Sequence, residues 1–142
     1  MEGKGRITGH TGLLALIGSP VGHSGSPAMY NYSFEKLGLD YAYVAFDIKV
    51  EEVKAALDAM RLFHMRGCNV TMPCKTEAAK YMDELSPAAR IIGAVNTIVN
   101  EDGKLIGHMT DGEGFVGNIS SISFSTYRLW ISSPWGKERK SQ

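Results

Sequence analysis

Apolar and polar residues follow one another along this chain in a pattern that predicts alternating strands and helices. Residues 13–17 form a continuous apolar run, which is typical of a strand buried on both faces. Residues 41–48 form a second run, rich in aromatic and β-branched residues, and a third run ends at residue 69. The stretches between them, residues 26–38 and about 50–63, carry apolar residues at helical spacing, such as Tyr30, Phe34 and Leu37.

The order strand, helix, strand, helix, strand is the βαβ pattern. It predicts an α/β fold with a mostly parallel open sheet flanked by helices. Ser26 is predicted to cap the first helix, with Pro27 at its first position and Gly38 at its C-terminal end. Further along, two β-rich runs at residues 94–100 and 104–110 flank an Asp-Gly turn, so we expect an antiparallel hairpin near the C-terminal end of the sheet.

Three further elements complete the expected fold. Lys75 is predicted to open a helical stretch, because Pro73 stops the ladder of the preceding strand. A short helix is expected from about residue 87 to residue 92, and a last helix from about Asp111, which is a good N-cap.

Composition narrows the classes of function. The 142 residues suit one domain with a real core, and fifteen basic residues balance fifteen acidic ones, so no nucleic acid or membrane partner is predicted. No apolar run is long enough to span a bilayer. Cys68 and Cys74 are the only cysteines, which favours a reducing, cytoplasmic setting, and the four histidines show no ligand spacing, so no metal site is assigned.

Polar side chains follow the predicted strands at the points where small-molecule sites form in open α/β sheets. They are hydroxyls, carboxamides, one amine and one carboxylate, a set that suits a small polyhydroxylated acid: Ser24, Ser26, Asn69, Thr71, Lys75, Asn96, Thr97 and Asp111. Each also has a structural interpretation. Ser26 and Asp111 can cap helices, Asn96 can bind a neighbouring loop, and Lys75 can be an exposed lysine of a first helical turn.

Four stretches in order resemble the successive signatures of the shikimate dehydrogenase family, which includes quinate/shikimate dehydrogenases. They are Gly18-Ser-Pro-Val-Gly-His-Ser-Gly-Ser-Pro27, Asn69-Val-Thr-Met-Pro-Cys-Lys75, Gly93-Ala-Val-Asn-Thr97 and Thr110-Asp-Gly-Glu-Gly-Phe115. The resemblance covers about residues 7–119. It implies an N-terminal substrate-binding α/β domain and, in the full-length family, a C-terminal Rossmann domain for NADP or NAD. It also implies interconversion of 3-dehydroshikimate and shikimate by hydride transfer.

The resemblance assigns roles to the polar residues. Ser24 and Ser26 would bind the substrate carboxylate, while ring hydroxyls would be held by Asn69, Thr71, Asn96 and Asp111. Lys75 would be the acid/base group, paired with Asp111. Because the aspartate favours the charged lysine, we treat the two as a coupled pair. Two positions depart from the family pattern: Gly25 replaces a larger apolar residue in the serine loop, and Cys74 stands before the lysine.

The expected cofactor domain has no counterpart in the sequence. Residues 1–119 are predicted to be the substrate-binding domain and residues 120–142 an atypical tail, rich in serine and holding both tryptophans. A Gly-x-Gly-x-x-Gly pattern at residues 112–117 lacks the following βα unit and acidic residue of a dinucleotide site, so no NADP or NAD is expected to bind this chain tightly.

Three hypotheses follow. The first is the substrate half of a shikimate/quinate dehydrogenase, which binds shikimate, 3-dehydroshikimate or quinate but does not turn over alone. The second is a non-catalytic module that binds a shikimate-like hydroxy acid. The third is an inactive fragment. The sequence does not specify the oligomeric state, the preference between shikimate and quinate, or that between NADP and NAD.

Overall fold

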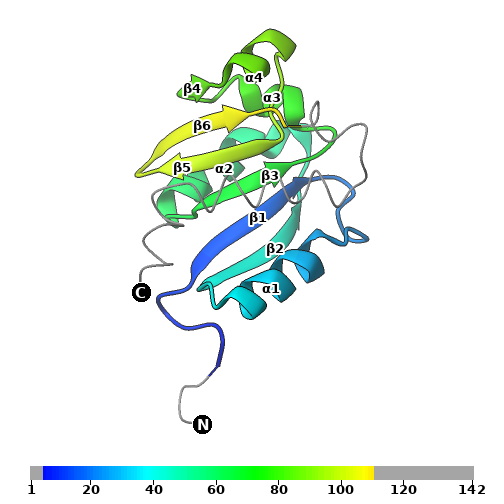
Figure 1. Ribbon diagram of the computed structural model, residues 1–142. Helices are drawn as coiled ribbons and strands as arrows, with labels where there is room; N and C mark the ends of the chain where they lie inside the picture. The colour runs from blue at the N-terminus through cyan, green and yellow to red at the C-terminus, as the bar shows by residue number, and fades with distance from the viewer. Residues whose placement is uncertain (1–4, 111–142) are drawn as a thin grey trace.

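A computed structural model describes residues 5–110 of the chain, and within them six strands form one sheet in the order β2-β1-β3-β5-β6-β4 (Figure 1). The strands are β1 (Gly12–Gly18), β2 (Tyr41–Asp47), β3 (Gly67–Val70), β4 (Glu84–Leu85), β5 (Thr97–Glu101) and β6 (Lys104–His108). β1 runs parallel to β2 and to β3, whereas β5 is antiparallel to both β3 and β6. The predicted α/β fold, with its mostly parallel sheet and antiparallel hairpin, is therefore confirmed.

The described helices are α1 (Ser26–Leu37), α2 (Val53–Leu62), α3 (Lys75–Ala79) and α4 (Pro87–Ile92), with a 3-10 turn η1 (Val50–Glu52) before α2. The ends of the predicted helices agree to within a few residues. The predicted cap of α1 is wrong: Gly25 occupies the N-cap position and Ser26 is the first helical residue. The Ser24 hydroxyl, one residue before the N-cap, accepts the Ser26 N–H at 3.1 Å. This bond satisfies one of the backbone donors at the start of α1.

Each face of the sheet packs its own core, because successive side chains of a strand point to opposite faces. Leu14 and Leu16 of β1 pack with Tyr30 and Phe34 of α1. Ala15 and Ile17 pack on the other face, with α2 and α3. α1 and α2 thus cover opposite faces, which Figure 1 shows as one helix beside β2 and another behind the sheet.

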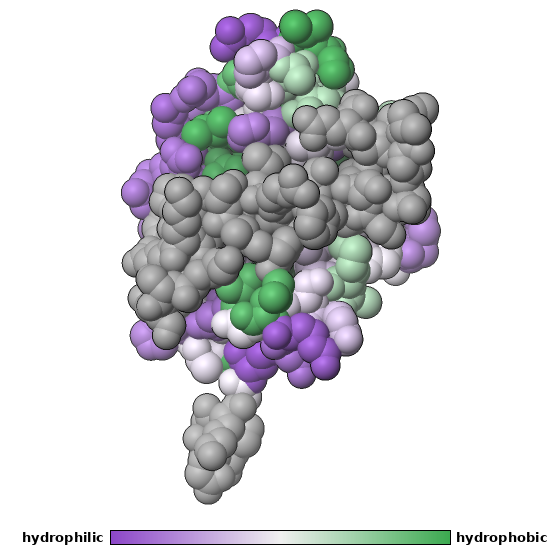
Figure 2. All heavy atoms as spheres, in the orientation of Figure 1, coloured by the Kyte–Doolittle hydropathy of each residue, from purple (hydrophilic) through white to green (hydrophobic). Residues whose placement is uncertain are grey.

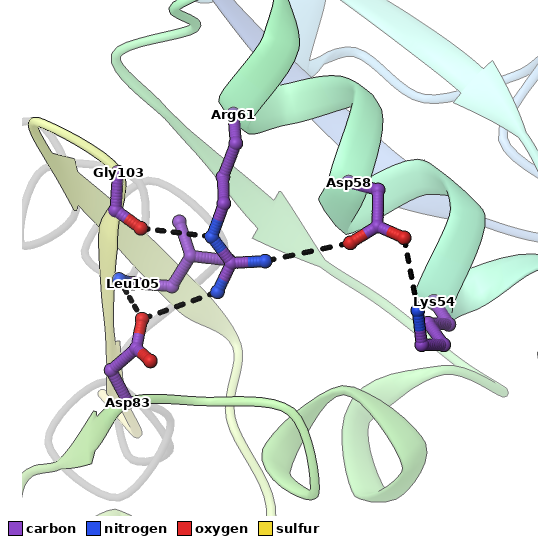
Figure 3. Close-up of polar contacts among 6 residues, drawn as sticks. All are labelled: Lys54, Asp58, Arg61, Asp83, Gly103 and Leu105. Carbon is purple, nitrogen blue, oxygen red and sulfur yellow. Dashed lines mark hydrogen bonds and ion pairs between the residues drawn. The ribbon is translucent and has the colours of Figure 1, made fainter.

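α2 is tied to the far hairpin by Arg61 (Figure 3). Its Nε donates to the carbonyl of Gly103 at 2.8 Å, in the turn between β5 and β6, and its Nη2 lies 3.2 Å from Asp83. The same Asp83 oxygen accepts the backbone N–H of Leu105 at 2.7 Å. One carboxylate and one guanidinium therefore connect α2, the approach to β4 and the start of β6.

Some surface on the described part of the chain is apolar. Figure 2 shows such surface over α4, where Ile91 is 86% exposed and Ile92 58% exposed. No helix among the described residues is long and apolar enough to cross a membrane. The predicted last helix, Asp111, the glycine pattern at 112–117 and the domain boundary between 119 and 120 all lie outside the described residues.

Candidate functional site

The predicted site lies where β1 and β3 end side by side. The Thr71 N–H donates to the carbonyl of Ile17 at 2.9 Å, and the Ser19 N–H donates to the carbonyl of Met72 at 3.0 Å. These bonds bring the loop after β3 against the loop after β1. The contact is close enough that a Cβ built on Gly18, whose φ is +151°, would lie 2.3 Å from the Thr71 methyl group.

Hydroxyls and carboxamides of α1, β2, β3 and β5 form a connected polar network at this end of the sheet. The Tyr43 hydroxyl donates to Oδ1 of Asn69 at 2.9 Å, and the side chain of Ser26 lies beside the same phenol. Nδ2 of Asn69 faces the carbonyl of Asn96 and the hydroxyl of Thr97, each at 3.4 Å. The network therefore joins predicted site residues that are up to 71 positions apart in sequence, from Ser26 to Thr97.

Asn96 holds the chain at the end of the hairpin. It is 5% exposed and comes one residue before β5, not within the strand as expected. Its Oδ1 accepts the Thr110 N–H at 3.0 Å, and its Nδ2 donates to the Thr110 hydroxyl, also at 3.0 Å. Asn96 thus binds a neighbouring segment, as its structural interpretation predicts. These bonds hold Thr110, the residue directly before Asp111.

Lys75 lies at the same end, at the start of α3. Its backbone carbonyl accepts the N–H of Val95 at 3.1 Å, so the first turn of α3 is joined to the residue before Asn96. The lysine is half-buried. The structure thus brings Ser24, Ser26, Asn69, Thr71, Lys75 and Asn96 to one end of the sheet. The partner of Lys75 in the predicted pair, Asp111, lies outside the described residues, so the pairing stays a prediction.

Tyr43 belongs to this site and was not predicted. Its position in an aromatic strand has the pattern of a core residue, and it is indeed 1% exposed. Burial raises the pKa of the Tyr43 phenol far above its usual value, as do the neighbouring Tyr30 and Cys68, and the Ser26 side chain opposes this only in part. The phenol is therefore a neutral donor. The available signal was its alternation with Tyr41, which places both side chains on the face that Asn69 also uses.

Burial favours the neutral forms of two cysteines and one histidine near the site. Cys68 and Cys74 are free, buried thiols, and burial raises the pKa of Cys68 to about 12, so Cys68 is not a nucleophile near neutral pH. Burial also lowers the pKa of His108, which favours its neutral form. Among residues 5–110, no three His, Cys, Asp or Glu side chains are grouped as metal ligands would be.

A separate cavity of about 260 Å³ lies between α2 and the sheet. It is lined almost wholly by apolar groups, including Leu13, Phe46, Met60 and Phe63, and holds none of the predicted site residues. A polyhydroxylated acid would lose its water there without gaining hydrogen bonds, so the cavity does not suit that ligand.

The described residues do not fit a dinucleotide. Gly-x-Gly-x-x-Gly, the turn that lets a backbone approach a pyrophosphate, does not occur within residues 5–110. The donors at the strand ends are side-chain hydroxyls and carboxamides. The loops after β1 and β3, which backbone hydrogen bonds join, lie beside them. They match a small ring with several hydroxyls rather than an extended nucleotide.

An open α/β sheet with such groups at its strand ends is a small-molecule-binding domain. Residues 16–98 match the sequence family described as the shikimate dehydrogenase substrate binding domain. The chain belongs to the shikimate dehydrogenase family, which confirms the resemblance found in the sequence.

Individual relatives agree. The NADP(+) shikimate dehydrogenase of Listeria monocytogenes serotype 4b is 55% identical over 111 residues, which are 78% of this chain and 38% of that protein. The crystal structure of the Listeria monocytogenes shikimate 5-dehydrogenase in complex with shikimate and NAD superposes with a TM-score of 0.76 at 54% identity, over 79% of this chain and 39% of that one.

A structure with a different named activity is also similar. The ligand-free 5-ketofructose reductase of Gluconobacter sp. strain CHM43 has a TM-score of 0.74 at 30% identity, over 80% of this chain and 41% of that one. The chain thus spans about two fifths of the length of the relatives it matches.

Proposed function

We propose that this chain binds shikimate, 3-dehydroshikimate or the related acid quinate as the substrate domain of a shikimate dehydrogenase. The observation that carries the proposal is the polar network that joins Ser26, Asn69 and Asn96 at the ends of the strands. A buried polar network is costly unless its members are satisfied, and such groups are suited to bind a ring that carries several hydroxyls.

In the proposed complex, Ser24 and Ser26 bind the carboxylate. Their hydroxyls lie at the N-terminal end of α1, where the helix dipole also favours an anion. Asn69, near the end of β3, and Thr71, in the loop after it, bind ring hydroxyls, and Asn96 supports that arrangement while it holds Thr110.

Lys75 and Asp111 form the acid/base pair of the proposed reaction. The amine of Lys75 exchanges a proton with the hydroxyl that becomes the ketone, and Asp111 keeps the amine oriented. NADP or NAD would supply the hydride chemistry in a longer protein. Binding of the acid by the described residues does not depend on that group.

A ligand titration tests the proposal. Because a ligand that binds only the folded state raises its stability, shikimate should raise the Tm of the 142-residue chain and shift NMR signals around Asn69 and Thr71. Benzoate, which has a carboxylate but no ring hydroxyls, is the ligand control and should bind far more weakly. Saturating shikimate without any change in Tm or spectrum would reject the proposal.

A matched pair of variants locates the ligand. Thr71→Val removes a hydroxyl from the loop after β3 and should weaken shikimate binding by about three- to tenfold, the usual worth of one neutral hydrogen bond. Thr76→Val makes the same change at an exposed position on α3 and should leave the Kd unchanged. Equal effects of the two substitutions would place the ligand elsewhere.

A second candidate is binding of a sugar-derived ketone. The similarity to the Gluconobacter 5-ketofructose reductase favours it, since that protein shares the fold at 30% identity. Titration of 5-ketofructose under the same conditions separates the two, because a site that needs the carboxylate of shikimate should not bind a neutral sugar.

A further inference from the structure

One buried tyrosine connects the two halves of the proposed site. Tyr43 lies in the middle of β2, at the edge of the sheet, and its side chain points to the face covered by α1. Its hydroxyl donates to Asn69 at 2.9 Å, and the side chain of Ser26 lies beside the same phenol. A single phenol oxygen therefore contacts a residue proposed for the carboxylate and a residue proposed for a ring hydroxyl.

We infer that Tyr43 is a positioning residue that fixes the orientation of the Asn69 carboxamide and of the Ser26 hydroxyl for ligand binding. The inference rests on the proposed function and extends it to a residue outside the four signature stretches. Tyr43 acts through its two neighbours and is not itself assigned a contact with the ligand.

The geometry of Asn69 explains why a positioning donor matters. A carboxamide presents an acceptor at one end and two donors at the other, and the two ends are nearly equal in size. When the Tyr43 hydroxyl donates, only the oxygen end of the Asn69 carboxamide can accept. Oδ1 of Asn69 therefore faces β2. Nδ2 is then directed to Asn96 and Thr97, at the longer distance of 3.4 Å. Without the phenol, the carboxamide loses its shortest hydrogen bond and can rotate.

Tyr43 is itself held firmly before any ligand binds. Its N–H and C=O both pair with the side chain of Asn31, at 2.9 and 2.8 Å. Its ring stacks on Tyr30, with centroids 4.7 Å apart and planes 20° from parallel. These contacts fix both the backbone and the ring, so the phenol oxygen has a defined place against which Ser26 and Asn69 are set.

A double-mutant cycle on the full 142-residue chain tests the inference. Tyr43→Phe should raise the Kd for shikimate about three- to tenfold, as expected for one lost neutral hydrogen bond. Asn69→Ala should raise it as well. If Tyr43 acts through Asn69, adding Tyr43→Phe to Asn69→Ala should raise the Kd by less than half of its effect in the wild-type chain.

Tyr41→Phe is the matched control. Tyr41 lies two residues earlier on the same face of β2, is also buried, and packs edge-on against Phe34. Removal of its hydroxyl should leave the Kd for shikimate unchanged. A Tyr43→Phe chain that binds shikimate as the wild type does would overturn the inference while leaving the proposed function intact, and so would fully additive effects in the cycle.

A measurement without ligand keeps the two claims separate. In the NMR spectrum of the wild-type chain, the side-chain amide signals of Asn69 should be sharp and distinct. In Tyr43→Phe they should shift and exchange faster with water, whereas in Tyr41→Phe they should not. Unchanged Asn69 signals in Tyr43→Phe would refute the positioning role even if the wild-type chain bound no shikimate, a result that would count against the proposed function instead.

Discussion

At the scale of single residues, Gly18 sets how closely the two site loops approach. Its φ is +151°, and there is no room for a side chain at this position. A Cβ would lie 2.3 Å from the Thr71 methyl group and 2.9 Å from the Met72 carbonyl oxygen. Backbone atoms cannot move aside cheaply, so a larger residue here must displace the loop that carries Thr71.

Gly18→Ala should therefore lower both stability and ligand binding. We expect a loss of about 1–3 kcal/mol in the free energy of unfolding, from strained backbone and overpacking together. Urea denaturation measures the loss. Gly22→Ala is the control, because a methyl group added at Gly22 would meet no atom within 4 Å, and this variant should stay close to wild type. Equal stability of the two variants would show that the loops can separate without cost.

Lys75 provides the prediction about chemistry. In a full-length relative that carries this motif, Lys75→Ala should lower kcat by about 10²- to 10⁴-fold, the usual contribution of a positioned acid/base group. Lys80→Ala is the matched control, because Lys80 lies at the other end of α3, is ion-paired with Glu77 at 3.0 Å and is largely exposed. Steady-state kinetics measure both. An unchanged kcat for Lys75→Ala would remove it as the proton carrier.

Sequence motifs singled out most of the polar side chains that the structure brings to this end of the sheet, but they missed the hydrogen bonds that connect them. Asn69 and Asn96 stood out because carboxamides at strand ends are unusual for a core, whereas Tyr43 did not, since an aromatic residue in a strand is ordinary. Ser26 was predicted to cap α1 by its residue type. The structure places Gly25 at that position, and the hydroxyl of the preceding Ser24 accepts the Ser26 N–H.

At the scale of elements, short strands and long-range pairings were the hardest to predict. β4 has two residues, too few for any periodic pattern, and it pairs with β6, which is about twenty residues farther along. The hairpin of β5 and β6 followed from its Asp-Gly turn, with Asp102 at φ 54° and Gly103 at φ 95°. Local turn chemistry is readable in sequence, and partner choice across the sheet is decided by packing.

Asp83 lets the contact between elements be tested by pH. The N–H of Leu105 and the guanidinium of Arg61 hold the pKa of Asp83 below its usual value. A carboxyl with a lowered folded pKa adds stability above its unfolded pKa of about 3.9, and that stability is lost as the pH falls from there toward the folded pKa. The free energy of unfolding of the wild-type chain should therefore fall in this acid range.

Asp83→Asn should lower stability at neutral pH and flatten this acid dependence, because the charge that responds to pH is gone. Urea denaturation at a series of pH values measures both effects. Asp102→Asn is the control: it removes an exposed carboxylate from the same hairpin and keeps the contacts of Arg61 and Leu105. An acid dependence that survives in Asp83→Asn would assign it to other carboxylates.

At the scale of the whole molecule, the proposed function assigns binding and turnover to different parts of a longer protein. The matched region is a substrate-binding domain, and the chain covers 38% of the Listeria relative. Removal of hydride from a secondary alcohol requires the acceptor to lie about 3–3.5 Å from the reacting carbon, in a fixed orientation. The described residues offer no dinucleotide turn that could hold such an acceptor.

We therefore expect the 142-residue chain to bind shikimate and yet produce no reduced cofactor. Mixed with shikimate and NADP, it should give no rise in absorbance at the wavelength of NADPH, whereas the full-length Listeria enzyme should give one under the same conditions. Joining residues 1–110 of this chain to the remaining part of that relative should restore turnover, because the acceptor is then held beside the site. Lys75→Ala in the joined protein should lower the restored activity by about 10²- to 10⁴-fold without abolishing shikimate binding. Reduction of NADP by the chain alone would contradict this division between binding and turnover, since it would require a nucleotide site within these 142 residues.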